Sequence, residues 1–99
     1  MKVNFHYVNI DSSDSLTDFI NNKLTNLNKK YNSIINAEIH LKKENTIEND
    51  KICEIELSLP GPRVFASSKE NNYELAVKNT ISDLEIQLKK RKELNKPYV

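Results

Sequence analysis

Residues 53–68 read CEIELSLPGPRVFASS, and this stretch decides the fold. Apolar residues at every second position from Cys53 to Leu59 alternate with polar ones, which is typical of a strand with one buried face. The Pro-Gly-Pro sequence at 60–62 contains the only glycine of the chain and is a strong turn signal. A second short strand follows at 64–68. The stretch therefore predicts an antiparallel hairpin.

Towards the N-terminus, three further segments have clear periodicity. Alternating apolar residues predict strands at 3–7 and 35–41, each with one buried face. Between them, apolar residues at spacings of three and four predict an amphipathic helix over residues 15–31. Ser15 and Asp18 resemble a capping box, which predicts where this helix begins.

Towards the C-terminus, a longer apolar stripe with helical spacing runs from Tyr73 to Leu88. It predicts a helix over residues 71–94, with Asn71 or Asn72 as its N-terminal cap. Pro97 cannot continue the helix, so the helix must end before it.

The predicted element order is β-α-β-β-β-α. A right-handed crossover makes the first two strands parallel, and the two later connections are antiparallel hairpins. We therefore expect an α+β two-layer sandwich, in which two helices pack on one face of a four-stranded mixed sheet. The 99 residues suit a single domain over residues 1–96, followed by a short tail at 97–99.

The composition is that of a soluble domain with a generous polar surface. The formal net charge is +1, with 37% hydrophobic and 29% charged residues. A single cysteine permits no internal disulfide and favours a reducing compartment. Neither a signal peptide nor a run of about 20 apolar residues is present. We expect a cytoplasmic protein without a membrane partner.

The sequence offers few residues for catalysis or cofactor binding. Because Gly61 is the only glycine, neither a P-loop nor a dinucleotide-binding fingerprint can exist. His6, His40 and Cys53 lie on different predicted strands without a close-spaced pair, so we expect no metal site. Cys53 shares the apolar phase of its strand, which predicts an inert core thiol. We expect no cofactor, and an enzyme would need a pocket that unites Cys53 with a histidine.

Basic residues gather near the C-terminus although the net charge is small. On the second helix, Lys78, Lys89 and Lys92 recur near one flank, and Lys90 and Arg91 widen the patch. Lys23 and Lys30 on the first helix join it if the two helices lie side by side. Structured RNA is recognised largely through phosphates and shape, which such cations suit. Lysines at a helix end that only complement the helix dipole are the alternative, and charge alone leaves both open.

The element order and several local sequences resemble the family of ribosome hibernation promoting factors and ribosome-associated inhibitor A, also called sigma-54 modulation proteins. The similarity extends over nearly the whole chain. It is carried by the turn and strand from Leu59 to Ser67, Tyr73 with Ala76 and Val77, the segment Leu84–Lys92, and Leu24, Leu27, Lys30 and Tyr31.

The resemblance implies a function. Members of this family bind the small ribosomal subunit in the channel for mRNA and tRNA, and they block translation in resting cells. By matched position, the residues that contact ribosomal RNA would be Lys89, Lys90 and Lys92, with Lys23, Lys30 and Lys78 as further candidates. Because the chain ends soon after the helix, the resemblance implies the short type, which promotes ribosome dimers beside a second small factor. We expect a monomer off the ribosome.

Two positions depart from the family signature. Ile86 stands where the signature has arginine, and Asp83 where a basic residue is common. Ile86 could contact ribosomal protein or another partner instead of RNA. Two alternative functions therefore stay open: a general module for structured RNA, and a protein-interaction domain that modulates transcription.

Overall fold

The computed structural model describes the backbone of residues 1–94 and the side chains of residues 1–92. The predicted tail at 97–99 thus lies outside the described residues. The elements are β1 (Lys2–Val8), α1 (Asp14–Lys30), β2 (Asn36–Lys43), β3 (Lys51–Ser58), β4 (Val64–Glu70) and α2 (Tyr73–Leu94). Their order confirms the predicted α+β fold.

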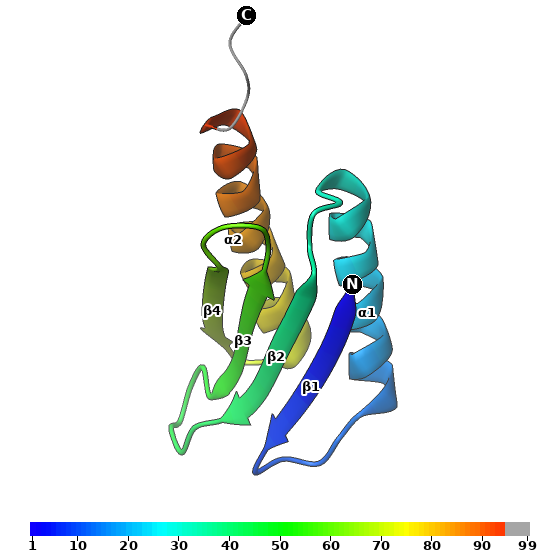
Figure 1. The fold of residues 1–99 in the computed structure, drawn as a ribbon. Coiled ribbons are helices and arrows are strands. Elements are labelled where there is room, and N and C mark those ends of the chain that lie inside the picture. The colour runs from blue at the N-terminus through cyan, green and yellow to red at the C-terminus, as the bar shows by residue number, and fades with distance from the viewer. Residues whose placement is uncertain (95–99) are drawn as a thin grey trace, which may run out of the picture.

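The four strands form one mixed sheet in the order β1-β2-β3-β4. β1 pairs with β2 in parallel, as the crossover predicts, and places Phe5 opposite Ile39. The pairs β2–β3 and β3–β4 are antiparallel, with Ile55 opposite both Ile39 and Ala66. Both helices cover the same face of this sheet (Figure 1).

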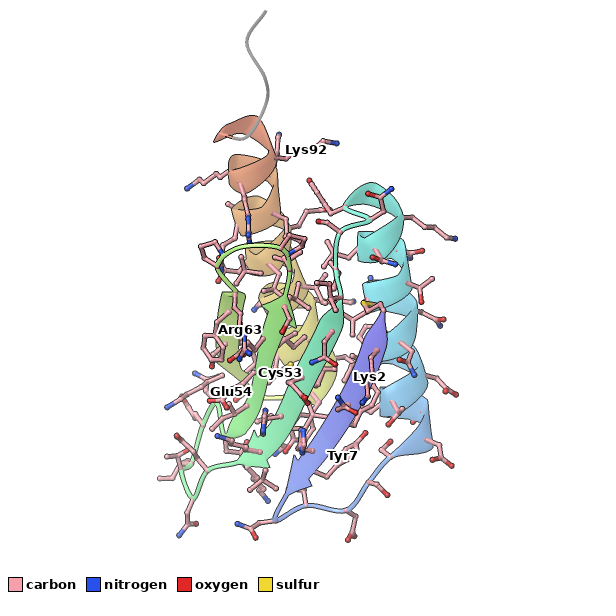
Figure 2. The ribbon with its side chains drawn as sticks, in the orientation of Figure 1. Lys2, Tyr7, Cys53, Glu54, Arg63 and Lys92 are labelled. Atoms are coloured by element: carbon pink, nitrogen blue, oxygen red, sulfur yellow. The ribbon has the colours of Figure 1, made fainter. Side chains whose placement is uncertain are left out.

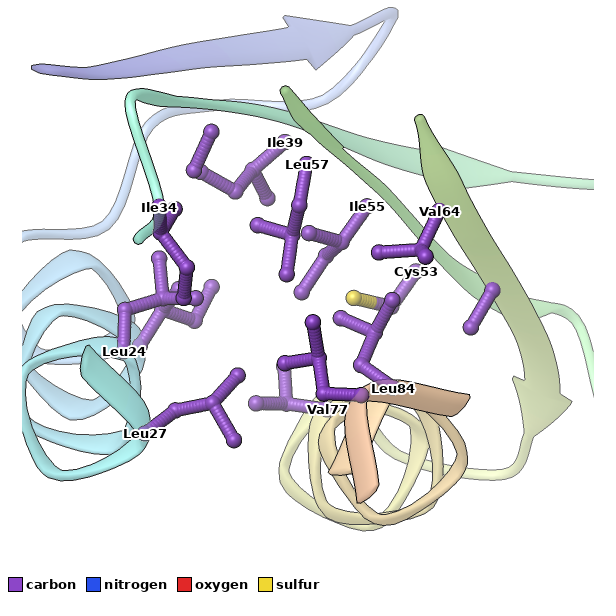
Figure 3. Close-up of a cluster of buried hydrophobic side chains, with 14 of the residues drawn as sticks. Leu24, Leu27, Ile34, Ile39, Cys53, Ile55, Leu57, Val64, Val77 and Leu84 are labelled. Carbon is purple, nitrogen blue, oxygen red and sulfur yellow. The ribbon is translucent and has the colours of Figure 1, made fainter. Parts of the chain in front are cut away.

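The core fills the space between the sheet and the two helices (Figure 3). Its largest fully buried side chains come from both layers: Ile20, Leu24, Ile39, Leu41, Ile55, Leu57, Val77 and Leu84. Thr80 is the one polar side chain among the buried described residues, and its hydroxyl donates to the carbonyls of Ala76 and Cys53. The bond to Cys53 joins α2 to β3 at the centre of the fold.

The predicted capping box at Ser15 is wrong. α1 begins at Asp14, and the Ser13 hydroxyl accepts a hydrogen bond from the Leu16 amide at 3.3 Å. The loop before the helix is fixed by Tyr7, whose hydroxyl donates to the Ser13 carbonyl and lies 2.6 Å from the Thr17 hydroxyl. This contact from β1 favours the start at Asp14, and capping rules that consider only the helix sequence do not include it.

The start of α2 is one of the two predicted alternatives. The Asn72 side chain accepts from the Leu75 amide at 2.8 Å and therefore caps the helix. Asn71 has a different role, since its side chain accepts from the Asn49 amide in the β2–β3 loop. β4 is two residues longer than predicted, because Lys69 and Glu70 pair with the start of β3.

The two helices run in the same direction. α1 follows β1 and α2 follows β4, which are parallel to each other through the pairings with β2 and β3. Each helix runs back along the sheet, so both C-terminal ends lie at the same end of the molecule (Figure 1). The last turns of α2 project beyond the strands at this end.

Candidate RNA-binding surface

The seven predicted cations occupy three places on the two helices. They are Lys89, Lys90, Arg91 and Lys92 in the last turns of α2, Lys78 near its start, and Lys23 and Lys30 on α1. Because the helices are parallel, Lys30 at the end of α1 lies beside the last turns of α2. The structure thus brings some of these cations together and leaves others apart.

The cations that come together surround Tyr31. One hollow, here called the C-terminal groove, has a volume of about 320 Å³ and contains Tyr31, Lys30 and Lys92. Its other lining residues are Asn32, Ser33, Leu59, Pro60, Leu88 and Arg91. A second hollow also contains Lys30 and Tyr31, together with Lys89 of α2. Lys30, Lys89 and Lys92 therefore form one basic surface across both helix ends.

Two contacts show how close the helices are at this surface. The Lys30 ammonium lies 3.0 Å from the Glu85 carboxylate, which offsets part of its positive charge. The Lys92 ammonium lies 5.9 Å from the centroid of the Tyr31 ring, within reach of a cation–π interaction. Figure 2 labels Lys92 near the end of α2. Among the described side chains, no carboxylate forms an ion pair with Lys89 or Lys92.

Lys90 lies on another flank of α2, and Arg91 lies between this flank and the C-terminal groove. Lys90 lines a hollow together with the β3–β4 turn. The Arg91 guanidinium donates to the carbonyls of Pro60 and Pro62, so it fastens the end of α2 to this turn. Arg91 therefore has a structural role, with two of its N–H donors bonded to the β3–β4 turn.

Lys78 and Lys23 lie apart from the helix ends. Lys78 shares the flank of Lys89 but stands about 16 Å from it along the helix axis, at 1.5 Å per residue. Lys23 is two turns before Lys30 on α1, and its ammonium lies 5.5 Å from the centroid of the Phe19 ring. Lys78 and Lys23 therefore lie outside the basic surface at the helix ends, nearer to the middle of the two helices.

The two departures from the family signature have different surroundings. The Gln87 amide donates to the Asp83 carboxylate at 3.5 Å and to the Phe65 carbonyl at 2.8 Å. Asp83 therefore lies on the β4 side of α2, away from Lys89. Ile86 is 52% exposed and lines the second hollow beside Tyr31.

Sequence reasoning treated Tyr31 as the last apolar residue of the first helix. The structure bears this out in part, since the ring packs against the core. The same side chain also lines both hollows, where it is surrounded by lysines. An aromatic residue directly after Lys29 and Lys30 at a helix end was the sequence signal that could have identified it as part of the site.

The residues considered for catalysis are arranged otherwise. Cys53 is buried, and burial raises the pKa of its thiol to about 12, so at neutral pH the thiol is not a nucleophile. It faces the helices, whereas the histidines lie on the opposite face of the sheet. The rings of His6 and His40 stack there with centroids 4.4 Å apart. The two histidines are neighbours because β1 and β2 pair and both residues face outward.

The stacked histidines have one acidic partner. His6 Nε2 lies 2.9 Å from the Glu38 carboxylate, and this hydrogen bond holds the pKa of Glu38 below its usual value. In the part of the chain that the structure describes, no group of three His, Cys, Asp or Glu residues could hold a metal ion. Within residues 1–94, neither helix is both long and apolar enough to cross a membrane.

Known proteins with similar sequence or structure were found. A ribosome hibernation promoting factor of Pseudomonas putida is 27% identical over 93 residues, which cover 94% of this chain and 88% of the relative. A ribosomal subunit interface protein from Coxiella burnetii is 25% identical and superposes with a TM-score of 0.84 over 94% of this chain and 99% of that one.

The N-terminal domain of Thermus thermophilus Protein Y has the same fold, with a TM-score of 0.79 and 22% identity over 91% of this chain and 98% of that one. Residues 3–96 match the family described as sigma 54 modulation protein / S30EA ribosomal protein. That match takes in both helices, all of the sheet except Lys2, and every cation of the candidate surface. The chain therefore belongs to the sigma 54 modulation protein / S30EA ribosomal protein family.

Proposed function

We propose that this chain is a ribosome hibernation factor. It binds the small ribosomal subunit in the decoding channel for mRNA and tRNA, and it inhibits translation in resting cells. Family membership supports a role on the ribosome, as do the names of its relatives, a ribosome hibernation promoting factor and a ribosomal subunit interface protein. The mechanism requires binding alone and no catalytic step.

The observation that carries this proposal is the meeting of Lys30, Lys89 and Lys92 at the paired helix ends. Ribosomal RNA presents closely spaced phosphates, and ammonium groups on a rigid surface can neutralise several of them at once. Once docked, the domain occupies space that mRNA and tRNA need. Steric exclusion then stops translation while the ribosome stays intact.

The proposal extends to the assembly state of the ribosome. We expect the protein to be a cytoplasmic monomer off the ribosome and to promote ribosome dimers together with a second small hibernation factor. Sucrose gradients of stationary-phase cells with and without the gene test this part. A ribosome dimer peak that is equally large without the gene contradicts dimer promotion. It does not test small-subunit binding, which the next experiment measures.

The test of small-subunit binding reverses three charges at the end of α2. Changing Lys89, Lys90 and Lys92 together to Glu lowers the formal net charge from +1 by six units to −5. This variant should lose co-sedimentation with small subunits because it repels the phosphates. Circular dichroism should show the same fold with a cooperative thermal transition, since these side chains are exposed. Its midpoint should be slightly lower than in the wild type, because carboxylates near a helix C-terminus oppose the helix dipole.

The matched control reverses three lysines elsewhere. Lys2→Glu, Lys43→Glu and Lys69→Glu cause the same change in net charge on the strands, and this variant should still bind. Binding by the α2 variant equal to wild type would refute the proposed surface. If the wild type binds duplex RNA as tightly as small subunits, the protein is a general RNA-binding module instead.

A further inference from the structure

The C-terminal groove has the composition of a ligand site. Its floor is apolar, formed by Leu59, Pro60 and Leu88, and its rim carries amide, hydroxyl and ammonium groups. Small-molecule sites in proteins combine an apolar lining with a few polar groups in this way. The side chains of Asn32 and Ser33 form no hydrogen bond with another described residue, so both are available to a ligand.

Among the described residues that line this groove, Tyr31 is the only aromatic one. Its ring is partly buried against the core, which fixes its position. The Lys92 ammonium lies 5.9 Å from the ring centroid, so an exposed cation rather than an apolar side chain lies over the ring. A nucleobase can take that place, because single-stranded nucleic acids stack their bases on aromatic side chains.

The phosphate of such a nucleotide would have two ammonium groups beside it. Lys30 and Lys92 come from different helices and both line the groove. The side chain of Lys30 is 65% exposed although it pairs with Glu85. It can therefore turn towards a phosphate without giving up contacts with the core. On the opposite wall, the contacts from Arg91 to Pro60 and Pro62 hold the turn in place before any ligand arrives.

From this geometry we infer that the C-terminal groove binds one unstacked RNA nucleotide. Its base stacks on Tyr31, its edge meets Asn32 and Ser33, and its phosphate lies between Lys30 and Lys92. The inference rests on the proposed function and adds a base contact to the phosphate contacts proposed there. Small-subunit binding then depends on an aromatic ring as well as on charge.

The first test uses fluorescence. The chain contains no tryptophan, so Tyr31→Trp places a single indole in the groove. A 5′-phosphorylated adenosine trinucleotide should quench the indole emission, because a stacked base quenches it. An abasic trimer with the same number of phosphates should not. Equal quenching by both trimers, or by neither, would overturn the inference.

The second test uses small subunits. Tyr31→Leu keeps an apolar side chain against the core but removes the stacking surface, so binding should weaken on the order of tenfold. Tyr31→Phe keeps the ring and should bind like the wild type. Thermal transitions of both variants check that they are folded.

The outcomes separate the two proposals. If the wild type fails to sediment with small subunits, the proposed function is wrong, whereas quenching by the trinucleotide alone would still support the groove as a nucleotide site. If the wild type sediments and Tyr31→Leu sediments equally, the nucleotide inference is wrong and the proposed function stands. If Tyr31→Leu binds small subunits more weakly but the trinucleotide does not quench Tyr31→Trp, the ring contacts a ribosomal protein instead. This result would also overturn the inference.

Discussion

Both the conformation and the surroundings of Gly61 restrict substitution at this position. Its φ is +92°, in the region that side chains rarely adopt, and a Cβ atom there would lie 2.6 Å from Nη2 of Arg91. The sequence predicted a turn at this position from the Pro-Gly-Pro pattern. It could not predict that an arginine 30 positions later would occupy the remaining space, since that contact depends on how α2 crosses the hairpin.

We expect Gly61→Ala to lower the free energy of unfolding by about 1–3 kcal/mol, because it strains the backbone and displaces the Arg91 guanidinium. Urea denaturation measures this change. Arg91→Met removes the displaced group, so the same glycine substitution in that background should cost less. An identical cost in both backgrounds would show that the backbone conformation alone matters.

Burial at single positions was predictable only where the pattern was regular. Cys53 follows the alternation of its strand and is fully buried, as predicted. Ile52 lies in the outward phase yet is only 5% exposed. It pairs with Lys42 and Lys69 on the neighbouring strands, and long side chains in these positions can cover it with their aliphatic parts. Such cover depends on strand register, which the strand's own sequence does not specify.

Among the elements, α1 shows where local sequence rules stop. Its apolar stripe and its end were predicted correctly to within about one residue, because helix periodicity is a property of the segment itself. Its start was less predictable, because both Ser13 and Ser15 could serve as the N-terminal cap. Tyr7 of β1 favours Ser13 by binding the Ser13 carbonyl and the Thr17 hydroxyl.

Serine substitutions can confirm this assignment. Ser13→Ala should lower the free energy of unfolding by about 1 kcal/mol, because the Leu16 amide loses its acceptor. Ser15→Ala should cost much less, since its exposed hydroxyl bonds only to Ser13 among the described residues. Thermal or urea unfolding gives both values. If Ser15→Ala lowers the free energy of unfolding more than Ser13→Ala does, the capping box at Ser15 that the sequence suggested is correct.

For the molecule as a whole, topology was the best-predicted property. The β1–α1–β2 crossover is right-handed, and the two later connections are hairpins. Only one arrangement of the elements meets both conditions and buries every apolar face. The composition of the site was less predictable. Seven cations were candidates from their spacing, but only the fold distinguishes Lys30, Lys89 and Lys92 around Tyr31 from Arg91, which binds the β3–β4 turn.

Salt dependence tests this distinction at the level of the complex. Small-subunit affinity should fall steeply as salt rises, with a straight line of log affinity against log salt concentration. Lys89→Gln should reduce the slope of that line by about one, because one phosphate contact is lost. Lys2→Gln on the sheet should leave it unchanged. A slope that does not respond to Lys89→Gln would remove this lysine from the interface.

The parallel course of α1 and α2 has a cost that antiparallel helices avoid. Their dipoles point the same way, so the partial negative charges of two sets of terminal carbonyls accumulate side by side. Lys30 and Lys92 stand in the last turns of the two helices, where positive charge offsets this repulsion. In the proposed complex, an RNA phosphate would attract the same two ammonium groups. RNA binding and the stability of the helix ends would then compete for these two charges.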